Sequence, residues 1–330
     1  MRTADFDYDL PGELIASHPP AERGASRMLV IDRAHGSVEH RQFRDFPSFV
    51  RPGDLSVFND TRVIPARVFS DDGGIELLCL DRPSPTEWRC LVRPGKKMKT
   101  GRTVRVGGAE GTVTEVLPNG DRVVRWDRPV DLERHGHLAL PHYIGRNDEP
   151  ADRERYQTVY AREEGAIAAP TAGLHFTPEI LGRLPHTFLT LHVGVGTFRP
   201  VKAENPADHV MHSERYETSA ETVRQINAAR RVIGIGTTVA RVLESLARKP
   251  AGHGTRLPEG DHRGETDIFI YPPYEFRAVD AMLTNFHLPK STLVMLVCAF
   301  AGRDLVMEAY RQAVRENYRF YSYGDCMLIL

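Results

Sequence analysis

Two segments of the sequence place a histidine among glycines and other small residues. His175 lies in APTAGLHFT at positions 169–177, and His192 lies in LHVGVGTF at positions 191–198. Imidazole titrates near pH 7, and small neighbours let the backbone approach a ligand closely. Each histidine is therefore either a proton-transfer residue or a hydrogen-bonded residue of the core. The small residues that we expect at the ligand are Thr171, Gly194 and Gly196.

A third segment, VIGIGTTV at positions 232–239, runs from an apolar strand through a glycine-rich turn into a helix. Free N–H groups at such a helix start favour a carboxylate or a phosphate. The third glycine of a dinucleotide-binding fingerprint is replaced by valine and alanine, so the pattern for a nicotinamide cofactor is weak. An anion site and a plain strand–helix turn both fit. The turn residues are Gly234, Gly236, Thr237 and Thr238.

Polar residues also gather at NDTRVIPAR (59–67), at LTNFHLPKST (283–292) and near the C-terminus. The first of these segments follows a buried apolar strand, and sheets of α/β proteins bind ligands at the carboxyl ends of their strands. A turn capped by asparagine and aspartate is the alternative. The candidate site residues in these segments are Asp60, Arg62, Arg67, Asn285, His287 and Asp325.

Positive charge is concentrated between positions 93 and 105, where six cations and no acid occur within 13 residues. A groove that follows an RNA backbone is the functional interpretation, and a solvated charged hairpin is the alternative. The cations are Arg93, Lys96, Lys97, Lys99, Arg102 and Arg105.

The pattern of strands and helices divides the chain. Strand and helix patterns alternate in 1–62 and 151–330, whereas 63–150 holds short strands and turn signals such as Asn119-Gly120. We predict a discontinuous α/β domain with a mixed sheet and helices (1–62 and 151–330) and an inserted small antiparallel β-barrel domain (63–150). Strands are expected at 28–32, 55–58, 75–80, 88–92, 103–106, 112–117, 122–126, 232–236 and 267–271, a loop at 249–264, and helices at 219–231, 238–248, 291–302 and 304–317, the last two with Ser291 and Asp304 as N-caps.

Overall charge and cysteine spacing exclude several classes of protein. The 330 residues carry 43 Lys and Arg against 44 Asp and Glu, which argues against a strongly basic DNA-coating protein and an acidic disordered chaperone. The four cysteines form no CxxC pair, and no apolar run reaches membrane-spanning length, so we expect a cytoplasmic protein. His209 and His212 have a spacing that suits a metal on a helix, but no third ligand stands out, and we predict no metal site.

Many of these segments occur together, in one order, in a known family. They include FDYDLPGELIA (6–16), SRMLV (26–30), VFNDTRVIPAR (57–67), LVRPGKK (91–97), DRERYQTVY (152–160), APTAGLHFT (169–177), LHVGVGTF (191–198), MHSE (211–214), TNFHLP (284–289) and YSYGD (321–325). The chain resembles, over nearly its whole length, the S-adenosylmethionine:tRNA ribosyltransferase-isomerase family of queuosine biosynthesis. The resemblance implies an α/β domain with an inserted β-barrel.

The resemblance also implies a reaction. The ribosyl part of S-adenosylmethionine moves to the aminomethyl group of 7-aminomethyl-7-deazaguanine at the wobble position of a tRNA with a GUN anticodon. The products are epoxyqueuosine-tRNA, adenine and methionine. S-adenosylmethionine is consumed as a co-substrate, its sulfonium activates its own carbons, and neither a metal nor a further cofactor is expected. The protein is expected to be a monomer.

Given this reaction, each group of candidate residues takes a role. His175 and His192 are expected to transfer protons, with Asp60 and Asp325 orienting them or balancing charge. The turn at 234–238 is expected to bind the methionine carboxylate. Asn285 and His287 would contact adenine or the deazaguanine edge, Arg62 and Arg67 a nearby phosphate, and the basic run the RNA backbone. A nicotinamide oxidoreductase and a non-catalytic RNA-binding module are the alternatives.

Overall fold

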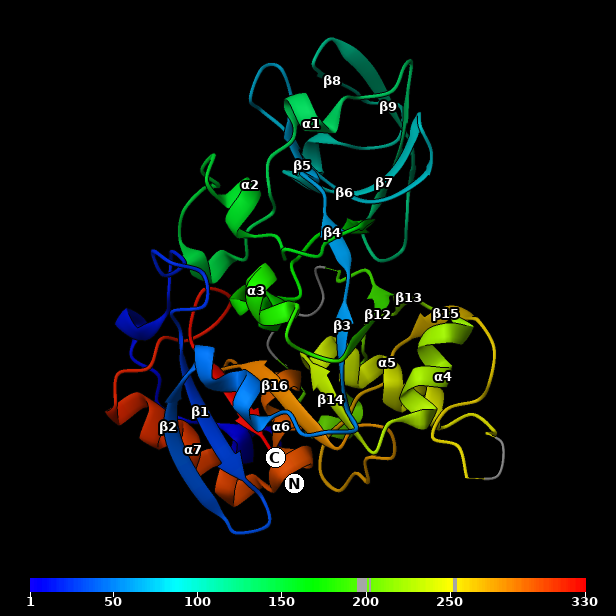
Figure 1. Ribbon diagram of the computed structural model, residues 1–330. Coiled ribbons are helices and arrows are strands. Elements are labelled where there is room, and N and C mark those ends of the chain that lie inside the picture. Colours follow the sequence, from blue (N-terminus) through cyan, green and yellow to red (C-terminus); the bar gives the residue numbers. More distant parts are fainter. Residues whose placement is uncertain (195–200, 202, 252–253) are drawn as a thin grey trace.

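The computed structural model describes residues 1–194, 201, 203–251 and 254–330, and its largest element is a mixed sheet of nine strands (Figure 1). Four neighbouring strands, at 186–191, 54–59, 231–235 and 281–285, run parallel. Their carboxyl ends therefore meet at one edge of the sheet. In spatial order the strands are β15 (His262–Thr266), β13 (Glu214–Thr218), β12 (His186–Leu191), β3 (Asp54–Asn59), β14 (Arg231–Ile235), β16 (Ala281–Asn285), β17 (Cys326–Ile329), β1 (Arg27–Asp32) and β2 (Ser37–Gln42).

Four longer helices accompany this sheet: α4 (Ala220–Ala228), α5 (Thr237–Ala247), α6 (Thr292–Ala301) and α7 (Arg303–Arg315). Ser219 and Ser291 cap α4 and α6, because each hydroxyl accepts a hydrogen bond from the N–H three residues later. Helix α5 follows β14 directly and packs on β14, β12 and β3, and nearly all of its residues are buried. The start of α5 is thereby held at the edge where the parallel strands end.

Six further strands form a second, antiparallel sheet that stands apart from the first (Figure 1). Its spatial order is β5 (Arg67–Phe69), β6 (Glu76–Ser84), β7 (Glu87–Arg93), β10 (Arg122–Trp126), β9 (Ala109–Val116) and β8 (Thr103–Val106). The N–H of Asp71 donates to the Arg105 carbonyl at 2.8 Å, which nearly closes the sheet into a barrel. Trp88 and Trp126 fill its core with ring centroids 4.9 Å apart. The predicted fold class, a mixed sheet with helices plus a small antiparallel barrel, is confirmed.

The remaining elements of the described chain are short. A two-stranded pair joins β4 (Thr61–Val63) to β11 (Glu163–Ala166). The short helices are α1 (Leu132–His135), α2 (Asp152–Arg155) and α3 (Pro178–Leu181), and the 3-10 turns are η1 (Thr3–Phe6), η2 (Gly12–Leu14), η3 (Phe43–Phe49), η4 (Gly95–Lys97), η5 (His142–Ile144), η6 (Thr171–His175) and η8 (Pro206–Asp208).

Two local predictions are wrong. Residues 267–271 form no strand; the strand lies at His262–Thr266, begins inside the predicted loop, and pairs through its backbone with β13. The predicted segment is apolar because Ile268 and Ile270 are buried in the core. Asp304 does not cap α7, since Gly302 occupies that position at φ +85° and Asp304 lies in the first turn.

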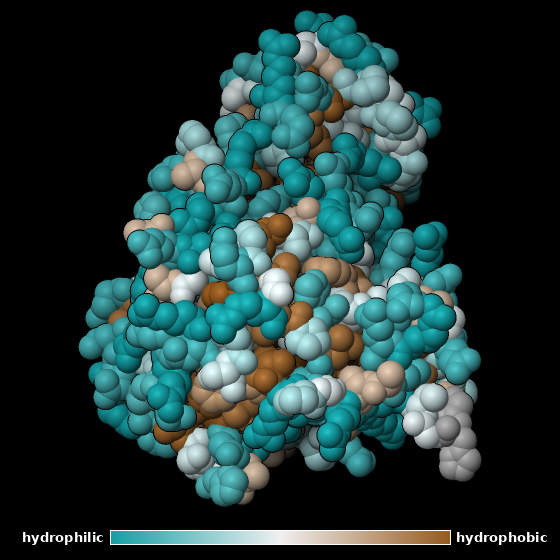
Figure 2. All heavy atoms as spheres, viewed as in Figure 1, coloured by the Kyte–Doolittle hydropathy of each residue, from teal (hydrophilic) through white to brown (hydrophobic). Residues whose placement is uncertain are grey.

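The surface agrees with this two-part architecture. Figure 2 shows a small and a large lobe whose viewed face is mostly hydrophilic, with hydrophobic residues showing near the middle of the larger lobe. Among the described residues, none of the helices is long and apolar enough to cross a membrane.

Candidate functional site

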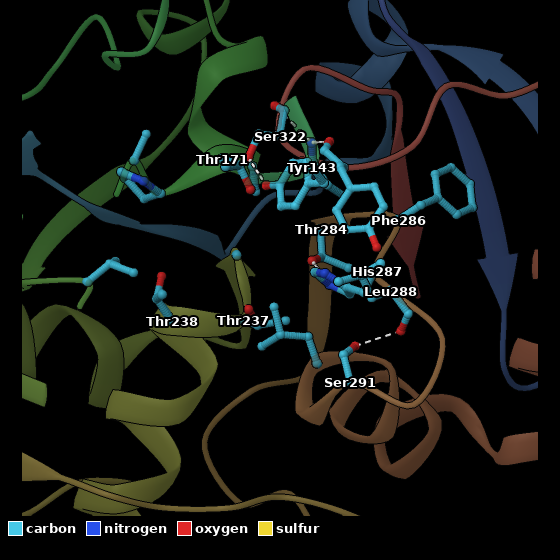
Figure 3. Close-up of a pocket in the computed structure, with 18 residues that line it drawn as sticks. Tyr143, Thr171, Thr237, Thr238, Thr284, Phe286, His287, Leu288, Ser291 and Ser322 are labelled. Carbon is cyan, nitrogen blue, oxygen red and sulfur yellow. Dashed lines mark hydrogen bonds between the residues drawn. The ribbon is translucent and has the colours of Figure 1, made fainter. Parts of the chain in front are cut away.

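A small pocket of about 60 Å³ opens where β14 and β16 end and α5 begins. We call it the α5 pocket. Figure 3 shows Thr237 and Thr238 on one side of it and Tyr143 and His287 on the other. Residues predicted for the site that line it are Thr171, Gly236, Thr237, Thr238, Asn285 and His287, joined by Tyr143, Thr284, Tyr321 and Ser322.

The start of α5 has hydrogen-bond donors that suit an anion. Gly236 is the N-cap at φ +96°, a backbone conformation that favours glycine, and no side chain of the described residues caps the helix. The hydroxyl of Thr238 is buried and has no hydrogen-bond partner among the residues that the structure describes. A buried polar group without a partner is costly, so these groups suit a ligand oxygen. Gly234 lies inside β14, beside Val279, and does not line the pocket.

Two stacked tyrosines form the opposite wall. The rings of Tyr143 and Tyr321 have centroids 4.2 Å apart and an interplanar angle of 29°. The Tyr143 hydroxyl lies 2.5 Å from Ser322 Oγ, while the buried Tyr321 hydroxyl has no partner in the described part of the chain. Tyr321 also adopts a positive φ of 74°, which is uncommon for a bulky residue. Burial raises the pKa of both phenols, so the wall is neutral.

His287 is the histidine of the pocket wall. Its Nε2 lies 2.8 Å from Thr284 Oγ1. Burial lowers its pKa to about 3, because an imidazolium ion there would lose its hydration. His287 is therefore a neutral imidazole that can exchange hydrogen bonds with a ligand.

His175 lies behind the pocket rather than in its lining. Its Nδ1 is 2.9 Å from Ser26 Oγ and its Nε2 is 3.1 Å from Asn285 Oδ1. The Asn285 amide nitrogen donates to the carbonyls of Tyr321 and Ser322, so its oxygen must face His175, and Nε2 of His175 must carry the proton. Burial lowers the pKa of His175 to about 4. Both candidate residues thus hold the 321–322 loop in place.

A larger cavity of about 520 Å³ lies between the barrel and the nine-stranded sheet. We call it the inter-sheet cleft. The barrel contributes β6, β7 and the hairpin around Asn119, and the other side carries His192, Gly194 and Glu214. Val193 and Leu293 line both this cleft and the α5 pocket, so the two cavities adjoin.

His192 reaches the inter-sheet cleft from the end of β12. Its Nδ1 is 2.8 Å from Thr61 Oγ1, whose hydroxyl donates to the Glu163 carbonyl at 3.4 Å. In the tautomer that donates from Nδ1 to Thr61, Nε2 is the proton acceptor. Burial, assisted by the positive charge of Arg215, lowers the pKa of His192. The backbone approaches the ring so closely at Gly165 that a Cβ there would lie 2.9 Å from Nδ1.

The remaining predicted site residues lie elsewhere. Asp60 is buried and binds the Arg162 guanidinium at 2.6 Å and the Thr190 hydroxyl at 2.7 Å. Asp325 accepts the backbone N–H groups of Arg27 and Arg319, and burial raises its pKa. Arg62 is exposed near Glu164, Arg67 pairs with Glu76 at 3.2 Å, and Gly196 lies outside the described residues.

The basic run occupies the barrel surface from the end of β7 into β8. All six cations are exposed, and within the described ranges five of them form no ion pair. Arg105 is the exception, since Glu110 binds its guanidinium through two contacts of 2.9 and 3.0 Å. Arg122 ties the lysine loop to the hairpin beside the inter-sheet cleft by donating to the carbonyls of Gly95 and Met98. The described residues contain no group of three metal-ligating side chains around His209, His212 or elsewhere.

Several residues of the two cavities gave no sequence signal. Tyr143 enters the α5 pocket from the segment after the barrel, far in sequence from its other walls. Arg241 and Glu214 meet in the inter-sheet cleft as a buried pair. Arg241 is isolated among ordinary residues in the sequence, whereas Glu214 ends the MHSE segment, to which the sequence assigned no role.

Comparison with known proteins identifies related sequences over the whole chain. Residues 3–329 match the family model described as "Queuosine biosynthesis protein". The chain is 51% identical to a protein of Symbiobacterium thermophilum and 47% identical to one of Solibacter usitatus, each covering 100% of both chains and each named S-adenosylmethionine:tRNA ribosyltransferase-isomerase. The crystal structure of S-adenosylmethionine tRNA ribosyltransferase from Thermotoga maritima matches with a TM-score of 0.57 and 39% identity, covering 99% of this chain and 100% of that one.

Proposed function

Because the chain belongs to the queuosine biosynthesis protein family, we propose that the α5 pocket and the inter-sheet cleft together form the active site of a tRNA-modifying transferase and isomerase. The enzyme transfers and isomerises the ribosyl moiety of S-adenosylmethionine. The observation that carries the placement of this substrate is the uncapped start of α5 beside the unpartnered Thr238 hydroxyl.

The α5 pocket takes the amino-acid end of S-adenosylmethionine. The carboxylate accepts hydrogen bonds from the first N–H groups of α5 and from Thr238, where the helix dipole favours negative charge. The sulfonium lies against the Tyr143 and Tyr321 rings, since aromatic faces attract cations. A cavity of about 60 Å³ has room for about five water-sized groups, so the nucleoside extends past Val193 into the larger cleft.

The inter-sheet cleft receives the base of the tRNA. We propose that this base is 7-aminomethyl-7-deazaguanine at the wobble position of a tRNA with a GUN anticodon, and that the products are epoxyqueuosine-tRNA, adenine and methionine. A loop base is already unpaired, so presenting it costs less than flipping a base out of a duplex. The exposed lysines beside the cleft bind the RNA backbone.

His192 is the proton-transfer residue of this proposal. Its neutral Nε2 takes a proton from the ammonium form of the aminomethyl group, which frees the amine to attack the ribosyl carbon. His175 is a positioning residue, because both of its nitrogens are engaged and it acts through Asn285 on the 321–322 loop. The sulfonium activates its own carbons, so we propose that neither a metal nor a further cofactor takes part. We further propose that the enzyme works as a cytoplasmic monomer.

Release of free adenine tests this function. The protein is mixed with S-adenosylmethionine and tRNA that carries the aminomethyl base, and adenine is quantified against modified base. We expect stoichiometric release, no binding of NADH, and a raised KM for decarboxylated S-adenosylmethionine, which lacks the group assigned to α5. Binding of the tRNA without release of adenine would contradict the proposal and favour an RNA-binding module.

A further inference from the structure

A buried arginine in the inter-sheet cleft has one nitrogen without a partner. Arg241 is 3% exposed and lines the cleft. Its Nε donates to the Ile268 carbonyl at 3.2 Å and its Nη1 donates to Glu214, but Nη2 has no partner among the described residues. A buried donor left unpaired is costly, so its acceptor is expected to come from the ligand.

The surroundings of Arg241 favour a neutral oxygen over an anion. Glu214, itself buried, neutralises the guanidinium and also accepts the Gly194 N–H at 3.1 Å. Four carboxylates line the cleft against three arginines, so a phosphate placed there would meet net negative charge. Such a lining suits a ligand that combines a carbonyl oxygen with a cationic arm.

Position in the cleft distinguishes between the two substrates. Arg241 lies one helical turn beyond Thr238 on α5, on the side of Val193 away from the proposed carboxylate site. Adenine has no carbonyl oxygen, whereas a guanine-type base carries one at its six position. The barrel hairpin that forms the opposite wall is tied by Arg122 to the exposed lysine loop, so an RNA held there would present its base to this cleft.

We propose that Arg241, held in place by Glu214, is a specificity-determining residue that donates from Nη2 to the six-position carbonyl oxygen of the RNA base. This inference rests on the proposed function, because it requires a guanine-type base to enter the cleft. A base that lacks this oxygen leaves a buried guanidinium N–H without an acceptor, which lowers the binding free energy. Because the loss occurs only with the wrong base, it discriminates strongly between substrates.

The test combines one substitution with one altered base. R241K keeps a cation beside Glu214 but removes the second nitrogen of the fork. The substrates are synthetic anticodon stem-loops that carry either the aminomethyl base or its analogue with hydrogen in place of the six-position oxygen. We expect wild type to lose roughly 10- to 100-fold in kcat/KM for RNA with the analogue. R241K should show the same loss with the normal base and little further loss with the analogue, at an unchanged KM for S-adenosylmethionine.

A second variant controls for the general cost of replacing an arginine that is ion-paired within the fold. Arg231 lies on β14, away from both cavities, where it pairs with Asp54 and donates to the Phe49 carbonyl. R231K should therefore keep the RNA kinetics of wild type. Equal use of both stem-loops by wild type would overturn the inference without any variant, even if R241K fails to fold. If R241K instead raises the KM for S-adenosylmethionine and leaves the RNA kinetics unchanged, Arg241 contacts S-adenosylmethionine and not the RNA base, which would also overturn the inference. Absence of adenine release by wild type with the normal base would instead contradict the proposed function itself.

Discussion

The α5 pocket and the inter-sheet cleft share a wall but differ in how their polar groups are used. In the pocket, the Thr238 and Tyr321 hydroxyls are buried without partners among the described residues. In the cleft, most charges are already paired, as in the contact of Arg215 with Asp81 at 2.9 Å. The pocket is built from one sheet, whereas the cleft needs both.

This difference indicates two kinds of ligand. Unpartnered donors in a small cavity hold a small ligand in one orientation, because each donor gains most when the ligand supplies its missing acceptor. Paired charges between two sheets can face water before a substrate binds, which suits the entry of part of a macromolecule. Substitutions in the two cavities should therefore affect different kinetic constants.

The largest effect is expected in the cleft, from His192→Ala. Loss of a proton-transfer group should lower kcat by about 10²- to 10⁴-fold with little change in KM for S-adenosylmethionine. Since the pKa of His192 is lowered, kcat of the wild type should be level around pH 7 to 8 and fall on acidification below about pH 6.5. His209→Ala is the matched control, because His209 lines the same cleft and packs on Phe269. Equal losses in the two variants would remove the special role of His192.

His175→Gln should alter stability more than chemistry. Lowering the folded-state pKa from 6.5 to about 4 disfavours the protonated form, so His175 contributes stability that is complete above pH 6.5 and is lost as pH falls toward 4. The lowering corresponds to about 3 kcal/mol. Denaturant unfolding of wild type and variant at pH 7 and pH 4.5 measures this contribution. The same pH dependence in both proteins would show that His175 is not a buried neutral group.

Local sequence patterns predicted most barrel strands and the four longer helices, but only β1, β3 and β14 of the nine-stranded sheet. Serine before an apolar run predicted the N-cap of α6, and short apolar runs between turn signals predicted all the barrel strands except the short β5. Strand β15 was missed because its sequence, HRGET, is polar and exposed, and it exists through backbone pairing with β13. Edge strands of this kind depend on a partner that local sequence does not specify.

Site residues could be predicted where a single segment holds all the functional groups. They could not be predicted where the groups come from several segments. The turn at 236–238 was found because glycines and threonines at a strand–helix junction have a local meaning. The roles of His175 and Asn285 were not, because their hydrogen bonds to each other and to Ser26 join segments more than 100 residues apart. Tyr143 and Arg241 likewise could not be predicted, because their burial and their neighbours in the folded chain make them candidates.

Thr238→Val tests the pocket side of the comparison. Valine keeps the shape of threonine and removes only the unpartnered hydroxyl. The KM for S-adenosylmethionine should rise roughly 10- to 100-fold, whereas the free energy of unfolding should stay level or increase, because a buried unsatisfied group is lost. Thr218→Val is the control, since the Thr218 hydroxyl on β13 is also buried without a partner in the described chain but lies away from the pocket. Similar KM values for both variants would refute the carboxylate assignment.

The smallest effect is expected at the exposed lysine loop of the barrel, where charge acts without burial. Replacing Lys96, Lys97 and Lys99 together by glutamine should weaken tRNA binding by about tenfold near 0.1 M salt and reduce the slope of log affinity against log salt by about 2, because each lost phosphate contact removes about 0.7. Arg105→Gln is the matched control: its guanidinium is already bound by Glu110, so its removal should change the slope less than one lysine does. Catalytic constants at saturating tRNA should stay unchanged in both proteins, since neither site reaches the α5 pocket. If the triple variant keeps the wild-type slope of log affinity against log salt, the barrel lysines do not bind RNA. The RNA would then have to be held at the inter-sheet cleft by residues of the larger sheet alone.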